Sequence, residues 1–272
     1  MISGNLNKMK SELVGPVEYV LPVGGHGLPL NQYLGKEIGL KYSGAINCVA
    51  CGRKTSKSFS QGFCFPCMQS LAQCDTCIIK PELCHYAQGT CREPEWGLAH
   101  CMRPHYVYLA NSSGVKVGIT RETQLPTRWI DQGAKQALPI FKVATRYQSG
   151  VLEVLLKQHV ADKTDWRALL KGDPEPTDLM SKRDELFDLC KTGIREARER
   201  FGEEAIMPLD AAELVNIDYP VLEYPIKITS LNLDKTPQIR GTLLGIKGQY
   251  LIFDIGVINV RKYTGYNVEV TE

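Results

Sequence analysis

The sequence predicts an α+β protein in which a Cys-rich, zinc-ribbon-like segment, a mixed sheet with flanking helices and a β-rich terminal module follow one another. Nine of the 10 cysteines fall between Cys48 and Cys101. The segment after them alternates strand-like and helical patterns, whereas the last part of the chain is strand-like again. With 272 residues, of which 43% are hydrophobic and 23% charged, the chain can bury a substantial core.

Shifts in composition divide the chain into five parts. Residues 1–47 hold β-rich patches broken by glycine and proline, residues 48–104 are Cys-rich, and residues 105–170 alternate strands and helices. Residues 171–215 form a helical connector, and residues 216–272 are strand-like. We expect this tail to form a small sheet or barrel that the N-terminal strands can complete, with a hairpin turn in its GIKG sequence.

Charge and hydropathy indicate the expected cellular compartment more than the function. The formal net charge of +2 and the pI near 8.0 neither require nor exclude a nucleic-acid partner. No apolar run approaches the ~20 residues needed to cross a bilayer. Residues 1–15 show no apolar stretch followed by a small-residue cleavage site. We therefore expect a cytoplasmic protein without a membrane partner, in a compartment where thiols stay reduced.

The first cysteine cluster predicts a structural zinc site. Cys48 and Cys51 form one Cys-x2-Cys pair, and Cys64 and Cys67 form another after a gap of 12 residues. Each pair can make a tight turn that directs two thiolates at one ion, and four sulfurs at about 2.3 Å suit tetrahedral Zn2+. We expect no disulfide scaffold, because residues 1–15 show no export signal, and four buried free thiols are the alternative to a metal site.

A second cluster follows at once and predicts a second metal centre, whose ligands the sequence leaves open. The compact ligand set is Cys74, Cys77, Cys84 and Cys91. The competing ligands are Cys101, His85, His100 and His105. Iron–sulfur clusters also use four thiolates, and several of these cysteines can equally serve as small core residues.

The segment after the cysteines predicts a hairpin, a helix, a strand and a second helix. The expected elements are strands at 106–110 and 115–120, a helix at 125–132, a strand at 140–146 and a helix at 151–160. The NSSG turn joins the first two strands, Arg128 lies on the first helix, and Glu153 falls in the first turn of the second.

This order, together with its motif residues, resembles the GIY-YIG nuclease superfamily, particularly its phage-type variants with a short hairpin. Tyr106-Val107-Tyr108 matches the GIY motif, and Lys116-Val117-Gly118 matches the YIG motif, although Tyr106 replaces the usual glycine and Lys116 the usual tyrosine. Asp162 and Asp165 lie where the family carries a late asparagine. The resemblance covers about 65 residues, and the layout of the whole chain resembles an uncharacterised bacterial family.

The resemblance implies a Mg2+-dependent nuclease site. A single carboxylate, Glu153, would hold Mg2+, and Arg128 would present a planar fork of donors to the phosphate. Tyr108 would act as general base, helped by the charge of Lys116, because a phenol pKa near 10 needs a nearby cation. The residues expected to contact the substrate are Tyr106, Gly118, Arg121 and Trp129. Trp129 can equally be a packing residue, and Tyr106 can face the core.

Two further function classes fit the same residues. A non-catalytic, zinc-containing nucleic-acid-binding protein would use the metal and the basic groups for binding and would not cleave. A metal-dependent nicking assay would distinguish it from a nuclease. An iron–sulfur or redox protein would use the cysteines for chemistry and would show a visible absorption band.

Overall fold

Strands from both ends of the chain build one β-module. The computed structural model describes residues 1–161 and 163–272. The 7-stranded sheet of this module has the order β1-β15-β5-β12-β13-β14, with β6 paired to β5, and its strands are antiparallel. The strands are β1 (Ile2–Asn5), β5 (Glu37–Asn47), β6 (Lys54–Thr55), β12 (Gln238–Lys247), β13 (Tyr250–Phe253), β14 (Gly256–Asn259) and β15 (Tyr266–Thr271).

A 3-stranded sheet shares the core of this module. It comprises β2 (Lys10–Glu12), β3 (Glu18–Val23) and β4 (His26–Pro29). In β3 and β15, every second side chain is buried, as the two-residue period of a strand requires. The expectation that N-terminal strands complete the sheet of the tail is confirmed, because β15 pairs with β1 on one side and β5 on the other.

The middle of the chain forms a second, 5-stranded sheet. Its order is β10-β9-β7-β8, and β11 also pairs with β9. The strands are β7 (His105–Asn111), β8 (Val115–Arg121), β9 (Gln136–Val143), β10 (Ile206–Pro208) and β11 (Val215–Asn216). The accompanying helices are α4 (Thr127–Asp131), α5 (Arg146–Leu156), α6 (Trp166–Leu169), α7 (Leu179–Leu189) and α8 (Lys191–Phe201).

Both faces of this second sheet are buried. Along β7, Val107 and Leu109 belong to the core formed with the helices, whereas Tyr108 and Ala110 belong to the core of the β-module. Successive side chains of a strand point to opposite faces, so the β-module covers one face of the sheet and the helices cover the other. Tyr108, on the face that the β-module covers, is therefore a core residue.

Two local boundaries differ from those expected. The second helix, α5, begins at Arg146 rather than Val151, because Thr145 and Gln148 form a capping box that starts it earlier. Glu153 consequently lies beyond the middle of α5, not in its first turn, and the preceding strand ends at Val143. In the tail, Gly248 lies in the hairpin turn with φ +61°, whereas Gly245 is part of β12.

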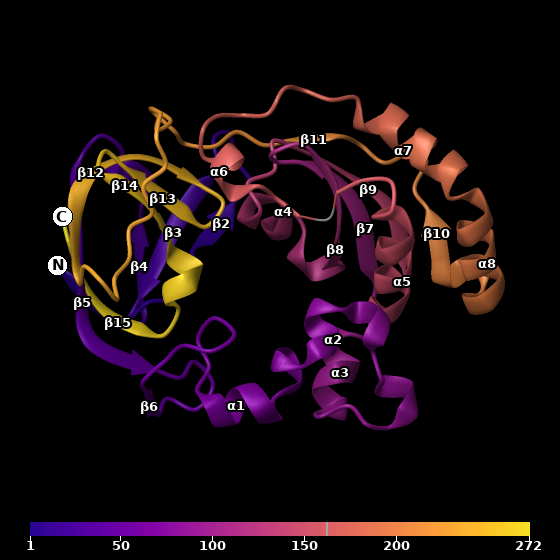
Figure 1. Cartoon of the computed structure of the whole chain (residues 1–272), viewed down its shortest axis with the longest axis horizontal. Helices are drawn as coiled ribbons and strands as arrows, with labels where there is room; N and C mark the ends of the chain where they lie inside the picture. Colours follow the sequence, from indigo (N-terminus) through magenta and orange to yellow (C-terminus); the bar gives the residue numbers. More distant parts are fainter. Residues whose placement is uncertain (162) are drawn as a thin grey trace.

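The Cys-rich segment connects the two sheets. It contains the short helices α1 (Phe65–Ser70), α2 (Thr76–Ile79) and α3 (Pro94–His100), joined by 3-10 turns. Figure 1 shows the β-module on the left, the second sheet on the right and this segment below them, so that the three parts surround the middle of the molecule. No helix among the described residues has the length and apolar character that crossing a bilayer requires.

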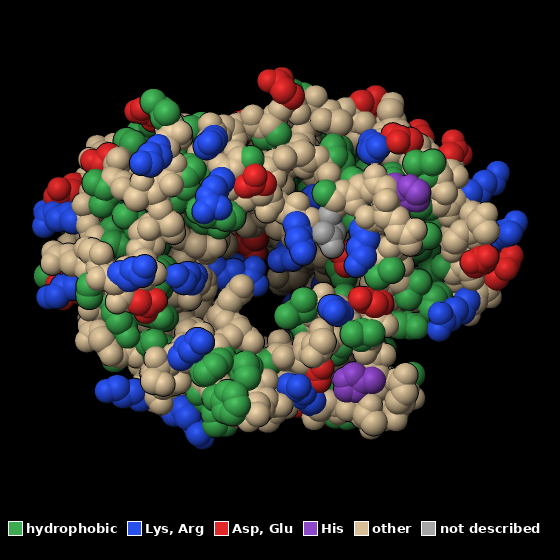
Figure 2. Space-filling model, in the orientation of Figure 1, with side chains coloured by type: hydrophobic (Ala, Val, Ile, Leu, Met, Phe, Trp, Pro, Cys, Tyr) green, Lys and Arg blue, Asp and Glu red, His purple; other side chains and the backbone are tan. Residues whose placement is uncertain are grey.

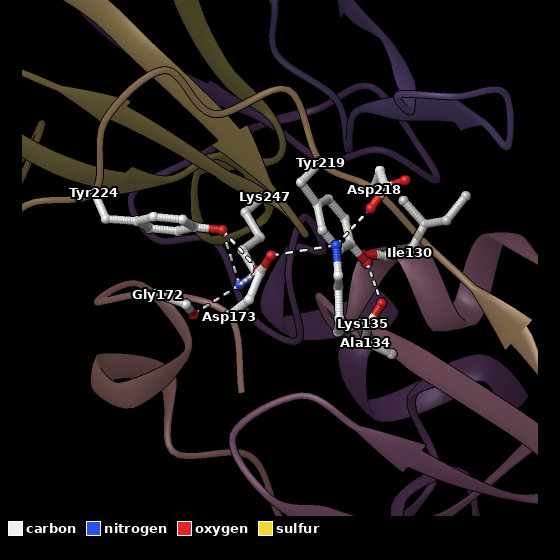
Figure 3. Close-up of polar contacts among 9 residues, drawn as sticks. All are labelled: Ile130, Ala134, Lys135, Gly172, Asp173, Asp218, Tyr219, Tyr224 and Lys247. Atoms are coloured by element: carbon white, nitrogen blue, oxygen red, sulfur yellow. Dashed lines mark hydrogen bonds and ion pairs between the residues drawn. The ribbon is translucent and has the colours of Figure 1, made fainter. Parts of the chain in front are cut away.

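An ion cluster around the buried Lys247 joins the β-module to the second sheet (Figure 3). The side chain of Lys247, at the end of β12, is 0% exposed, and its Nζ donates to Asp173 Oδ1 at 2.7 Å, to the carbonyl of Gly172 at 3.0 Å and to Tyr224 OH at 3.2 Å. Lys135 pairs with the other carboxylate oxygen of Asp173 at 3.3 Å. Burial lowers the pKa of Lys247, and Asp173 opposes that effect. Asp173 is thus an interface residue.

Candidate functional site

The first cysteine cluster forms as expected. The sulfurs of Cys48, Cys51, Cys64 and Cys67 all lie within 4.8 Å of one another, and those of Cys51 and Cys64 are 3.8 Å apart. Four sulfurs at about 2.3 Å from a tetrahedral ion are separated by about 3.8 Å, so this cluster could bind a metal such as zinc. The N–H of Val49 donates to the carbonyl of Gly62 at 2.9 Å, which ties the two Cys-x2-Cys turns together.

The second cysteine cluster does not contain all of the compact ligand set. Cys77, Cys84 and Cys91 line a small cavity together with Cys101. Cys74 instead packs against Cys48, Phe63 and Cys64, and it lines a different, larger pocket. Cys74 is therefore placed near the first cluster, because the turn at 72–74 separates it from Cys77.

Of the three competing histidines, only His85 lines the small cavity. His100 stacks on Trp96 with ring centroids 4.3 Å apart. His105 is fully buried in β7, where its Nδ1 lies 2.7 Å from the carbonyl of Arg103, and burial lowers its pKa to about 4. His100 and His105 are thus placed as packing residues.

A larger pocket opens where the three parts of the molecule meet. It has a volume of about 510 Å³ and is lined by β8, α4, α5, the Cys-rich segment and the turn at Val260–Tyr263. Its charged residues are Lys116, Arg121, Arg128, Arg146, Arg261, Asp75 and Glu153. Figure 2 shows the molecule hollowed at its centre, with Lys and Arg side chains around the opening. We call this the central pocket.

Each functional side chain reaches the central pocket from a defined element. Lys116, Gly118 and Arg121 come from β8, the edge strand of its sheet in the described part of the chain. Arg146 and Glu153 are seven residues apart on α5, so they lie two turns apart on one face of the helix. Five cationic groups therefore converge with the carboxylates of Glu153 and Asp75, and Asp75 also pairs with Arg92 at 2.7 Å.

The cations of the pocket are crowded. Burial lowers the pKa of Arg146, and the like charge of Arg128 lowers it further. Burial and Arg128 have the same two effects on Arg261. Both arginines nevertheless keep their positive charge at neutral pH, because a guanidinium stays protonated in proteins. A bound anion would relieve this repulsion, so the pocket suits a phosphate or another multiply charged oxyanion.

The structure brings together five of the eight residues that the sequence predicted for the catalytic and substrate site. Lys116, Gly118, Arg121, Arg128 and Glu153 all line the central pocket. Lys116 is 4% exposed, and its Nζ donates to Thr164 Oγ1 at 2.5 Å. Asp162 lies outside the described residues, and Asp165 caps the N-terminus of α6.

The three predicted aromatic residues do not line the central pocket. Tyr108 is 0% exposed and donates to Gln132 Oε1 at 3.1 Å, and burial raises its pKa, which is the direction opposite to that of a general base. Trp129 packs edge-on against Tyr108, with centroids 6.0 Å apart, which agrees with the packing alternative. Tyr106 donates to Glu122 at 3.3 Å. The β-module covers Tyr108 and Trp129, and the sequence of 105–170 contains no sign of that contact.

Sequence reasoning missed two cations of the central pocket. Arg146 was assigned to the end of a strand, and the Thr145–Gln148 capping pair was the signal that could have placed it on α5. Arg261 comes from the β-module, more than a hundred residues further along the chain, and no local pattern marks it.

The fold and these sites define an α+β protein with a four-cysteine cluster that could bind a metal and, beside it, a cationic pocket. Over residues 35–268 the chain matches the family described as "Protein of unknown function (DUF2797)", and it belongs to that family. This agrees with the resemblance of the whole chain to an uncharacterised family. No curated protein and no solved structure matches the chain.

Proposed function

We propose that the central pocket binds the phosphate backbone of a nucleic acid and cleaves a phosphodiester bond with the help of Mg2+. The observation that carries this proposal is the convergence of five cations with Glu153 in one pocket of about 510 Å³. Guanidinium groups match phosphate oxygens in shape and charge, and Glu153 is the carboxylate that could hold a hard cation beside them.

The roles follow from where each residue lies. Arg128 and Arg146, from α4 and α5, would neutralise the phosphate whose charge grows as the bond breaks. Glu153 would hold one Mg2+, which when bound supplies further neutralisation and a more acidic water. The proposed mechanism gives Tyr108 no role as a general base, because Tyr108 is buried behind Gly118. The order β7, β8, α4, β9, α5 and the resemblance to the GIY-YIG nucleases motivate the choice of cleavage.

The test is nicking of supercoiled plasmid and of a structured RNA in Mg2+. We expect the wild type to cut at least one substrate and Glu153→Gln to cut neither, with unchanged zinc content. Glu199→Gln is the matched control, because Glu199 is an exposed carboxylate on α8, far from the pocket lining. Equal activity of wild type and Glu153→Gln would contradict the assignment.

The burial of Tyr108 favours a second candidate, a nucleic-acid-binding protein without catalysis. A phenol with a raised pKa supplies no base at neutral pH. In this case neither the wild type nor Glu153→Gln cleaves, while both bind a labelled oligonucleotide with an affinity that falls steeply with salt.

A further inference from the structure

We propose that Cys77, Cys84, Cys91 and Cys101 form a second structural site for Zn2+, built from four thiolates. This site is separate from the cluster of Cys48, Cys51, Cys64 and Cys67, and it does not depend on the function proposed for the central pocket.

The four side chains line one small cavity. Cys77 comes from α2, Cys84 and Cys91 from the turns that follow, and Cys101 from the residue that ends α3. The volume of this cavity is about 10 Å³, which is about the space of one water-sized sphere. The other lining residues include Ala72, Ile78, Tyr86, Trp96 and Gly97. Asp75 and His85 complete the lining, and the remaining, apolar side chains around four thiols are typical of a closed structural zinc site.

The backbone around the cavity allows the close approach of α3. A Cβ at position 97 would lie 3.2 Å from the sulfur of Cys91 and 3.0 Å from the ring of Tyr86, so only glycine fits there without displacement. The sulfur of Cys91 lies 3.6 Å from the carbonyl of Glu93. Gly97 thus lets the helix that ends at Cys101 come near the turn that carries Cys91.

Two other groups compete for an ion near Cys77. A carboxylate oxygen of Asp75, the sulfur of Cys77 and a ring nitrogen of His85 lie within 4.8 Å of one another. Both competing side chains are already engaged, however. Asp75 pairs with Arg92 at 2.7 Å and caps α2, whereas His85 contacts Thr90 Oγ1 through Nδ1 at 2.8 Å and Asp75 Oδ2 through Nε2 at 3.5 Å. Four thiolates leave these contacts intact.

The proposed site also bears on the central pocket. Arg146 Nη2 donates to the carbonyl of Ile78 at 2.6 Å, and its backbone N–H donates to the carbonyl of Cys101 at 2.8 Å. Ile78, which accepts the first bond, directly follows the proposed ligand Cys77. Cys101, which accepts the second, is itself a proposed ligand. An ion bound there would fix the backbone that holds Arg146 at the rim of the pocket.

The experiment measures zinc per chain in the full-length protein and in single variants. We expect two zinc ions in the wild type, one in Cys101→Ser and one in Cys84→Ser. Cys74→Ser is the matched control, since Cys74 lies outside the small cavity, and it should keep two, as should His85→Ala. Substitution with Co2+ should show the ligand-field bands of two tetrathiolate sites in the wild type and one in Cys84→Ser, whose retained first site reports that the protein is folded.

Three results would overturn the proposal: one zinc per chain in the wild type, loss of an ion in Cys74→Ser or His85→Ala but not in Cys101→Ser, or iron with a visible absorption band in place of zinc. If Cys101→Ser fails to fold because Cys101 is buried, Cys84→Ser, in a half-buried turn, decides between these outcomes.

Discussion

Tyr108 and Gly118 lie directly opposite each other on β7 and β8, and the ring of Tyr108 covers the glycine. A Cβ at position 118 would lie 2.7 Å from both Cζ and the hydroxyl oxygen of Tyr108. The sequence suggested that this glycine admits a substrate. Its contacts show that it makes room for a buried aromatic ring beneath the central pocket.

Replacing Gly118 by alanine should therefore destabilise the protein. We expect a loss of about 1 to 3 kcal/mol, because the added methyl group overpacks a site that is closed on one side by Tyr108. Gly172→Ala is the control, since a Cβ there meets nothing within 4 Å, and its effect should stay within about 0.5 kcal/mol. Urea unfolding measures both. Equal stability of the two variants would show that the Tyr108 ring moves freely.

The cluster around Lys247 should respond asymmetrically to the loss of either partner. Asp173→Ala leaves the cation of Lys247 buried with neutral partners, and we expect a cost of about 3 to 5 kcal/mol. Lys247→Met leaves Asp173 partly exposed and still paired with Lys135, so its cost should be smaller, about 1 kcal/mol. Thermal unfolding of the two variants, side by side, decides the order. If Lys247→Met lost more stability than Asp173→Ala, the attraction between Lys247 and Asp173, and not the cost of an unpaired buried cation, would dominate at this interface.

His105 should make stability depend on pH. Its pKa is about 4 in the folded protein and about 6.5 when unfolded, so above pH ~6.5 it is neutral in both states. Below that pH the unfolded chain takes up a proton first, and stability falls as pH drops toward 4, by up to ~3 kcal/mol.

The measurement compares the wild type with His105→Asn, which keeps a donor for Arg103 and does not titrate. The difference between their unfolding free energies should change between pH 6.5 and 4.5. This comparison removes the effects of acid that the two proteins share. His159→Asn, at an exposed position, serves as control and should follow the wild type. A constant difference across this range would refute the assignment.

Nucleic-acid binding should depend on Arg261 although it lies in the β-module. If the central pocket holds phosphates, Arg261→Ala and Arg121→Ala should each lower the slope of log affinity against log salt by about 1. Arg195→Ala, on the exposed face of α8, should leave the slope unchanged. Fluorescence anisotropy with a labelled oligonucleotide at several salt concentrations measures this. If Arg195→Ala weakens binding as much as Arg261→Ala, the nucleic acid responds to the overall surface charge and not to the central pocket.

The predictions from sequence succeeded where the deciding contacts are local. The first cysteine cluster needed only two Cys-x2-Cys turns and their spacing. Arg128 follows β8 after a short turn, and Glu153 reaches the pocket because α5 packs against β8. The second cluster was ambiguous, because spacing alone treats Cys74 and Cys101 alike, and only the path of α3 separates them.

The failures came from contacts between distant parts of the chain. Tyr108 and Trp129 carry the residue types of a site, yet the β-module buries them. Arg261 enters the pocket through the same packing. Asp173 meets Lys247, which lies more than seventy residues further along the chain, across the interface. None of these contacts leaves a periodic signal in a single sequence.

The pairing of β1 with β15 sets an order of events during synthesis. Ile2 pairs with Val270, so the first strand must wait for almost the entire chain to emerge before its partner exists. At ~5 to 20 residues per second, this wait lasts roughly tens of seconds. The thiol-rich segment and the sheet around β7 are complete much earlier. The first cysteine cluster could therefore bind a metal while β1 still lacks its partner strand.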